Sequence, residues 1–190
     1  MKKSQETRRL AAVAPGSRGF GFAVVEGMAL INWETIWAEE GNKNEEALKK
    51  LAPLFDEYKP KGLVMFDALA PGSRRAPRIR ELTRRIIDSA RERRISVKLF
   101  SRQQIGQAIT GKPKATKYQV AEVLAETFSE PLAHRLPKKR RAWQSEDSRM
   151  DMFDAVALAI VGQVKRGKTP PKPSASTSKV SLPAAAFWQS

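Results

Sequence analysis

The chain has 190 residues, and its 35 lysines and arginines outnumber its 20 aspartates and glutamates, which gives a formal net charge of +15 and a pI near 10.4. This balance is typical of a protein that binds nucleic-acid phosphates, although a basic ribosomal or membrane-surface protein would have a similar one. The lack of cysteine excludes disulfides, and no run reaches the roughly 18 apolar residues of a membrane helix, so we expect a cytoplasmic protein with no membrane partner.

One domain is predicted, flanked by two segments of biased composition. Residues 1–9 form a short basic leader, and residues 10–166 have the length of a single domain with a normal core. The segment 167–190 is rich in proline and serine, a composition that predicts a disordered tail. Phe187 and Trp188 near its end could dock on a protein partner, although an unstructured end is the simpler interpretation.

The first half of the domain is predicted to contain most of a sheet. Apolar runs with glycine at the bends predict strands at 10–14, 19–26 and 29–37, a helix from about Asn44 to Tyr58, and a strand at 62–66. Gly27 marks the second turn, so the first three strands should form an antiparallel meander. The last strand stops at Asp67, and ligands of open α/β sheets gather at such strand ends.

An arginine-rich segment follows this strand. Between Pro71 and Arg94 there are nine arginines against three acids, a local balance of +6. Apolar positions at spacings of three and four predict a helix with one stripe on the sheet, formed by Ile79, Leu82, Ile86, Ile87 and Ala90. The charged face could be a solvated surface that keeps the protein soluble. Its place directly after Asp67 favours bidentate phosphate contacts, which we assign to Arg74, Arg75 and Arg78.

The second half of the domain adds a strand at 95–100 and helices near 102–109, 116–129 and 150–165. Thr116 and Gln119 form a capping box for the second of these helices. Two crossover strands added to the meander predict an α/β fold with a mixed five-stranded sheet flanked by helices.

Asp151 and Asp154 lie near the start of the last predicted helix. Their spacing of three places both carboxylates on one face of that helix. Paired carboxylates of this kind suit a divalent cation. Acids at a helix start can also serve only to cap the helix and complement its dipole, so the pair by itself leaves a structural role open.

Several motifs occur in a fixed order along the chain. Ala14-Pro15-Gly16 ends the first strand, Gly19-Phe20-Gly21 opens the second, and Asp67 ends the buried strand. Residues 107–120 contain Gln107-Ala-Ile-Thr-Gly-Lys-Pro-Lys-Ala-Thr-Lys117-Tyr-Gln-Val120, and the last helix begins Asp151-Met-Phe-Asp154-Ala-Val-Ala-Leu-Ala-Ile. With these motifs the chain resembles the RuvC Holliday-junction resolvases of the RNase H-like superfamily.

The resemblance implies an RNase H-like fold and a metal-dependent, structure-selective endonuclease that hydrolyses phosphodiester bonds in branched DNA such as four-way junctions. It implies up to two Mg²⁺ or Mn²⁺ ions, with Asp67, Asp151 and Asp154 as ligands at three of the family's four acid positions. Lys117 matches a family lysine near the scissile phosphate. A homodimer is expected, because a four-way junction needs two related nicks and a two-fold assembly supplies them.

Ala14 stands at the position of the family's first acid, where a methyl group cannot bind a cation. A central carboxylate bridges ions about 3.5 to 4 Å apart in two-metal hydrolysis, so we expect weakened metal binding and strongly reduced catalysis. Either Ala14 replaces an aspartate of a parent sequence, which the otherwise intact acids favour, or the chain is a natural paralogue that binds without cutting. Glu26, Glu146 or Asp147 could substitute for the missing acid.

Further basic residues are expected to contact DNA phosphates without reading sequence. They are Lys112, Lys114 and Lys117 in the third motif, and Lys138, Lys139, Arg140 and Arg141 in a loop before the last helix. Trp143, beside that loop, could stack on a base, although such a tryptophan more often anchors the loop to the core. His134 has no partner at ligand spacing, so no zinc site is expected.

Two other functions stay open from the sequence. A non-catalytic branched-DNA-binding or scaffold protein of the same fold would keep the positive charge without needing an acid at position 14. An RNase H-like nuclease acting on RNA would have the same acids and differ in its substrate preference.

Overall fold

A mixed five-stranded sheet forms the centre of the structure, a computed structural model that describes residues 9–38, 40–141 and 143–165. The strands are β1 (Arg9–Pro15), β2 (Gly19–Glu26), β3 (Ala29–Trp37), β4 (Gly62–Phe66) and β5 (Ser96–Phe100), in the spatial order β3-β2-β1-β4-β5. β2 pairs antiparallel with β1 and β3, whereas β4 pairs parallel with β1 and β5. The sheet therefore joins a meander to two crossover strands, as predicted.

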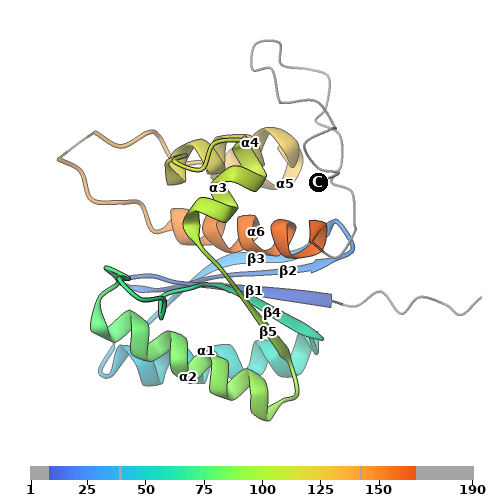
Figure 1. Ribbon diagram of the computed structural model, residues 1–190, viewed down its shortest axis with the longest axis vertical. Coiled ribbons are helices and arrows are strands. Elements are labelled where there is room, and N and C mark those ends of the chain that lie inside the picture. Colours follow the sequence, from blue (N-terminus) through green and yellow to red (C-terminus); the bar gives the residue numbers. More distant parts are fainter. Residues whose placement is uncertain (1–8, 39, 142, 166–190) are drawn as a thin grey trace, which may run out of the picture.

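Helices cover both faces of this sheet (Figure 1). One face packs against α1 (Lys43–Tyr58) and α2 (Pro77–Glu92), and the other against α6 (Arg149–Val164). Beyond α6 lie α3 (Arg102–Thr110), α4 (Lys117–Thr127), the short α5 (Ser129–Leu132) and a 3-10 turn, η1 (Ala133–Arg135). The predicted fold class is confirmed, and the helix predicted over 116–129 ends at Thr127 because Phe128 leaves the helical conformation.

The arginine-rich segment folds as the predicted helix, with its apolar stripe on the sheet. The five stripe residues are all buried in the core between α2 and the sheet, namely Ile79, Leu82, Ile86, Ile87 and Ala90. Pro77 begins the helix at a position where its missing N–H would have had no intrahelical partner. Arg80, Arg84 and Arg91 are exposed, so burial of the stripe leaves the charge in solvent.

Alternation along β1 divides its side chains between two cores. Leu10, Ala12 and Ala14 belong to the core on the α6 side, and Ala11 and Val13 to the core on the α1 and α2 side. The alanines are small, and α6 lies directly over them with nearly all of its residues buried. This close layer positions the start of α6 beside the carboxyl end of β1.

Two glycines let α6 approach the sheet at both of its ends. A side-chain carbon at Gly21 would lie 1.8 Å from the backbone oxygen of Asp151, near the start of α6. One at Gly162, near the end of the helix, would lie 2.7 Å from side-chain atoms of Leu10 and Val64. Because the atom facing Gly21 belongs to the backbone, a side chain there would push the start of α6 away from β2.

The predicted leader over 1–8 and the predicted tail over 167–190 lie outside the described residues. Arg9, grouped with the leader from the sequence, instead begins β1 and forms an ion pair with Glu26 on β2 at 3.0 Å. Within the part of the chain that the structure describes, no helix has the length and apolar character needed to cross a membrane.

Candidate nucleic-acid interface and acid centre

The carboxyl end of β4 and the amino ends of α3, α4 and α6 meet at one end of the sheet. Arg102, the first residue of α3, lies 4.2 Å from the ring centre of Phe66, the last residue of β4. Lys117, the first residue of α4, and Arg102 both reach Asp154 on α6. The ion-paired group at this point is termed the acid centre and consists of Arg102, Lys117, Glu146, Asp151 and Asp154.

Asp154 is the buried member of the acid centre, with 5% of its surface exposed. Arg102 donates a hydrogen bond of 3.0 Å to each of its carboxylate oxygens, and Lys117 Nζ lies 3.0 Å from Oδ2. Burial alone would raise the pKa of Asp154, but the charges of Lys117 and Arg102 outweigh it and hold the pKa below its ordinary value. Asp154 is therefore an ionised carboxylate whose charge is compensated inside the protein.

Lys117 connects all three acids of the centre. Its Nζ lies 2.9 Å from Glu146 Oε2, 3.5 Å from Asp151 Oδ1 and 3.0 Å from Asp154 Oδ2. Burial disfavours the charged form, yet the nearby Asp154 and Asp151 raise the pKa of Lys117 above its ordinary value. The predicted capping box of Thr116 is present and fixes the start of α4, so the lysine projects from a rigid position.

Asp151 lies one helical turn before Asp154 and is compensated less well. Burial, together with the negative charge of Asp154, outweighs the attraction of Lys117 and raises the pKa of Asp151 to about 6. Gly16, just after β1, lies against this carboxylate, because a side-chain carbon there would be 1.9 Å from Asp151 Oδ2. The turn between β1 and β2 therefore covers one side of Asp151.

Asp67 and Ala14 lie outside this network of ion pairs. Asp67 is half-buried, and its carboxylate accepts a hydrogen bond of 3.1 Å from the backbone N–H of Leu69, which closes a turn after β4. Ala14 is 2% exposed and lies among apolar residues on the α6 side of the sheet. The structure thus gives Asp67 a local turn contact and gives Ala14 an apolar environment.

The predicted ligands Asp67, Asp151 and Asp154 do not fit a divalent cation in this arrangement. Within the described ranges, no three histidine, cysteine, aspartate or glutamate side chains form a group that could hold a metal ion. Mg²⁺ requires oxygen ligands in a near-octahedral arrangement. Both oxygens of Asp154 instead face the nitrogens of Arg102 and Lys117. Metal binding therefore stays a prediction from the sequence resemblance.

A cleft of about 500 Å³ opens beside Asp151. Its walls come from the β1–β2 turn, the loop before α2, the start of α4 and the segment before α6. Five basic side chains line it against three acidic ones, a positive balance of two: Arg18, Arg74, Arg75, Arg78 and Lys117 against Glu146, Asp147 and Asp151. A lining with this balance suits a phosphate backbone.

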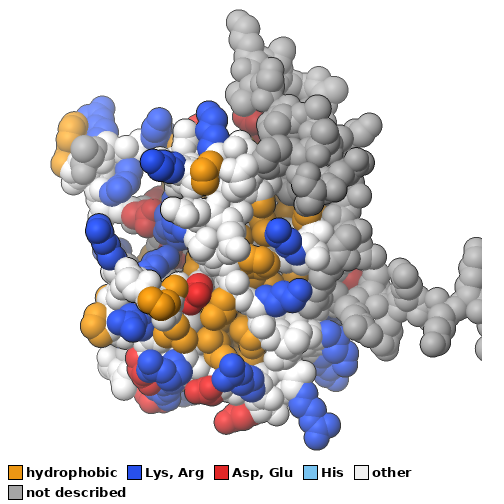
Figure 2. Space-filling view, viewed as in Figure 1, with side chains coloured by type: hydrophobic (Ala, Val, Ile, Leu, Met, Phe, Trp, Pro, Cys, Tyr) orange, Lys and Arg blue, Asp and Glu red, His pale blue; other side chains and the backbone are white. Residues whose placement is uncertain are grey.

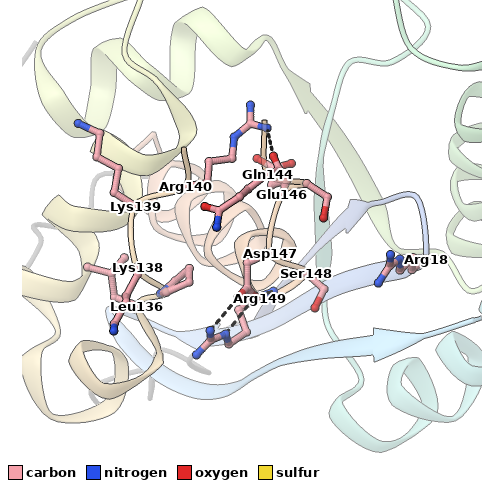
Figure 3. Close-up of a pocket in the computed structure, with 12 residues that line it drawn as sticks. Arg18, Leu136, Lys138, Lys139, Arg140, Gln144, Glu146, Asp147, Ser148 and Arg149 are labelled. Atoms are coloured by element: carbon pink, nitrogen blue, oxygen red, sulfur yellow. Dashed lines mark hydrogen bonds and ion pairs between the residues drawn. The ribbon is translucent and has the colours of Figure 1, made fainter. Parts of the chain in front are cut away.

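A second cleft of about 930 Å³ continues along the segment that leads into α6 (Figure 3). The two clefts share Arg18 and residues 145–148. Lys138, Lys139 and Arg140 line the second cleft, whereas its Arg149 is paired with Asp147 at 2.7 Å. In Figure 2, lysine and arginine side chains surround a hollow on this side of the molecule.

The residues predicted to contact DNA fall into two groups. Arg74 and Arg75 line the first cleft, and the exposed ones are Arg74, Lys112, Lys114, Lys138, Lys139, Arg140 and Arg141. Lys117 and Arg78 form the second group. They also line the first cleft, but their side chains bind other groups of the protein. Arg78 donates hydrogen bonds to the backbone oxygens of Gly16 and Ser17 at 2.9 and 3.1 Å, so it holds the β1–β2 turn in place.

Trp143 is 76% exposed, and the guanidinium of Arg141 lies 5.5 Å from its ring centre. The expectation that this tryptophan anchors its loop to the core is therefore wrong. Pro137 is buried and Leu136 packs against the core, so these residues fix the start of the loop instead. His134 is exposed.

Arg102 is the main residue of the site that sequence reasoning missed. It follows Ser101, whose capping box with Gln104 begins α3. A helix dipole disfavours a cation at the first position of a helix. A basic residue at this unfavourable position is therefore the sequence signal that could have identified Arg102. Arg18, at the β1–β2 turn, was also missed.

The arrangement of sheet and helices is that of a RuvC-like, RNase H-like domain, which confirms the predicted resemblance at the level of the fold. The chain is similar to Thermus thermophilus RuvC, with a TM-score of 0.60 and 18% identity, covering 87% of this chain and 99% of that one. It is also similar to T. thermophilus RuvC in complex with Holliday junction substrate (TM-score 0.57, 16% identity, 80% and 91% covered).

The yeast mitochondrial Holliday junction resolvase Ydc2 is a third similar structure, with a TM-score of 0.52 and 14% identity, covering 84% of this chain and 81% of that one. No protein-family model and no curated protein matches the sequence. The chain therefore shares the fold of these three solved structures.

Proposed function

We propose that this protein binds branched DNA, such as four-way junctions, and that its capacity to hydrolyse phosphodiester bonds is impaired. The observation that carries the proposal is the basic cleft beside Asp151, at the end of a RuvC-like sheet. One of the similar solved structures is a RuvC in complex with Holliday junction substrate, which supports branched DNA as the ligand class.

Phosphate contacts supply the binding energy in this proposal. Arg18, Arg74 and Arg75 line the first cleft, and the exposed cations Lys138 and Lys139 extend it along the segment before α6. A DNA strand in the first cleft would pass Asp151, and the arm beyond it would follow the second cleft. Release of counterions from the phosphates makes such binding strongly dependent on salt.

Impaired hydrolysis rests on two features of the acid centre. Ala14 offers no oxygen to a metal ion, and Asp154 is held by Arg102 and Lys117. Without a bound ion, no group would activate water or stabilise the leaving oxygen in the manner of two-metal hydrolysis. These features support a natural protein that binds without cutting over an introduced Ala14.

A Mg²⁺-dependent or Mn²⁺-dependent endonuclease is the second candidate. It is favoured by the retention of Asp67, Asp151 and Asp154 at three of the four acid positions of the family. In that case the ions would be held by these three carboxylates, and the chain would act as a homodimer that makes paired nicks.

The experiment that separates the candidates compares a labelled synthetic four-way junction with duplex and RNA of equal length at equal salt. The unchanged chain and its Ala14→Asp variant are each tested for binding in EDTA and for cutting in Mg²⁺ and Mn²⁺. We expect tighter binding to the junction than to duplex or RNA by both proteins, and no cutting by the unchanged chain.

Equal affinity for junction and duplex would contradict branch recognition. Symmetric nicks made by the unchanged chain would establish the endonuclease instead. Preferential binding or cutting of RNA would assign the protein to the RNA-directed alternative.

A further inference from the structure

The acid centre contains two cations whose positions are determined by the fold. Arg102 is fixed from behind by the ring of Phe66 at 4.2 Å and by the capped start of α3. Lys117 is fixed by the capped start of α4. Both side chains are largely buried, with 37% of the Arg102 side chain and 19% of the Lys117 side chain exposed. These contacts distinguish them from surface cations, which lose more conformational entropy when they form ion pairs.

The two cations engage every oxygen of the most deeply buried acid. Oδ1 of Asp154 accepts from Arg102, and Oδ2 lies 3.0 Å from both Arg102 and Lys117. An ion at this carboxylate would need at least one of these oxygens at about 2.0 to 2.1 Å, the distance that Mg²⁺ requires. One or both cations would first have to leave, and their positive charge would repel the ion while they stayed.

From these contacts we propose that Arg102 and Lys117 act as a built-in substitute for a divalent cation at Asp154. The acid centre is then not a functional metal site, and its carboxylates need no metal ion to compensate their charge. The inference about the metal site does not depend on the proposed function. Only its consequence for DNA, that junction binding is independent of divalent metal, rests on the proposed function.

The proposal extends to position 14. Ala14 and Phe66 belong to the same core cluster at the ends of the neighbouring parallel strands β1 and β4. Arg102 covers the ring of Phe66, so a carboxylate introduced at position 14 would have this guanidinium close by. Restoring the missing acid alone would give Arg102 a further partner and would not create a metal site. Removal of Arg102 is needed as well.

The test is a titration of the full chain with Mn²⁺, in which free ion is measured by electron paramagnetic resonance. Four proteins are compared: the unchanged chain, Ala14→Asp, Arg102→Gln and the double variant. The matched control is Arg149→Gln, which removes an arginine from an exposed ion pair on the same helix as Asp154. Circular dichroism spectra establish that each protein is folded.

We expect no saturable binding of Mn²⁺ at millimolar concentration by the unchanged chain, by Ala14→Asp or by the control. The double variant should bind at least about tenfold more tightly than Ala14→Asp, a difference of roughly 1.4 kcal/mol. Saturable binding by the unchanged chain that Asp154→Asn removes would overturn the proposal. So would binding by Ala14→Asp as tight as that of the double variant.

A second measurement avoids variants altogether. Junction affinity of the unchanged chain is compared in EDTA and in Mg²⁺ at matched ionic strength, and we expect the two values to agree within about twofold, because no ion has to enter the acid centre. A tenfold gain of junction affinity in Mg²⁺ would contradict the proposal that Arg102 and Lys117 replace a divalent cation. Failure to bind any junction would reject the proposed function, while the Mn²⁺ titration would still decide the question of the metal site.

Discussion

The cations of this protein form two groups that differ in what balances their charge. The inner cations, Arg102 and Lys117, face acids at 2.9 to 3.5 Å. The outer cations are Arg18, Arg74 and Arg75 in the first cleft and Lys138 and Lys139 in the second. Within the described ranges, the outer cations have no carboxylate partner at ion-pair distance. The fold therefore balances the inner charge itself and leaves the outer charge to be balanced by a ligand.

This difference shows that positive charge in one site can have two roles. Inner cations stabilise the fold and occupy the carboxylates, whereas outer cations add little to stability and are available for phosphates. A substitution in one group should therefore affect a property that a substitution in the other group does not affect.

The largest expected effect is the loss of stability in Arg102→Ala. Removing one partner of a buried ion pair leaves Asp154 undercompensated, and we expect the free energy of unfolding to fall by about 3 kcal/mol. Urea denaturation at pH 7 measures this change. Junction affinity should stay within about twofold of the original, because Arg102 lies outside the clefts. A loss of affinity as large as that caused by substituting the outer cations would remove the distinction between the two groups.

The second effect is on DNA. The triple variant Arg18→Gln, Arg74→Gln and Arg75→Gln should lower junction affinity about 30-fold at 0.1 M salt and reduce the slope of log K against log salt by about 3. Its unfolding free energy should change by less than about 0.5 kcal/mol. Fluorescence anisotropy across a salt series measures the affinity and the slope, and urea denaturation measures the unfolding free energy.

The control for the triple variant removes the same charge elsewhere. Lys49, Lys61 and Lys98 are exposed and line neither cleft, so replacing all three with glutamine should reduce affinity much less. Equal losses in the two triple variants would show that net charge, and not the cleft, determines binding.

A smaller effect is expected at Trp143, which is exposed beside Arg141. If its ring stacks on an unpaired base, Trp143→Ala should weaken binding to a junction by about 1 kcal/mol, and Trp143→Phe should retain most of the affinity. Binding to fully paired duplex should not change. An equal loss with both DNAs would assign the residue to phosphate-side packing and not to stacking.

The smallest effect concerns the pH dependence of stability. The folded pKa of Asp151 is about 6, above its ordinary value of 3.8, so between these values the folded state binds more protons than the unfolded state. The unfolding free energy of the unchanged chain should therefore decrease as the pH rises through this window. Asp151→Asn should be more stable than the unchanged chain at pH 8 and equal to it below pH 4, as measured by thermal melts. A constant difference at all pH values would contradict this assignment.

Much of the fold followed from local pattern. The apolar run that ends at Asp67 is one continuous strand and was predicted with the observed bounds. The stripe on α2 recurs at the helical period, so a helix was predicted within residues 71–94, and the observed helix is Pro77–Glu92. Strand pairing could not be derived in this way, because β1 contacts β4 across more than forty intervening residues and only the resemblance indicated their order.

The site was predicted less completely. The motifs assigned Asp67, Lys117, Asp151 and Asp154 to one site, and the structure brings the last three together. The motifs gave no sign that Arg102 completes the group. Arg102 comes from a separate helix, and its contact with Asp154 depends on how α3 packs against α6. Long side chains such as this one reach partners that neighbouring sequence does not reveal.

Gly16, Gly21 and Gly162 have a consequence for genetics. They carry no charged side chain, yet each leaves space that α6 needs, because an added side-chain carbon would lie 1.8 to 2.7 Å from the nearest atom. A mutational scan would therefore score Gly16 and Gly21 as severely as Asp151, which both of them adjoin. Such a scan would therefore detect the packing surface of α6 as well as a functional surface. A sensitive glycine would first indicate a steric clash with α6, and only then a role in function.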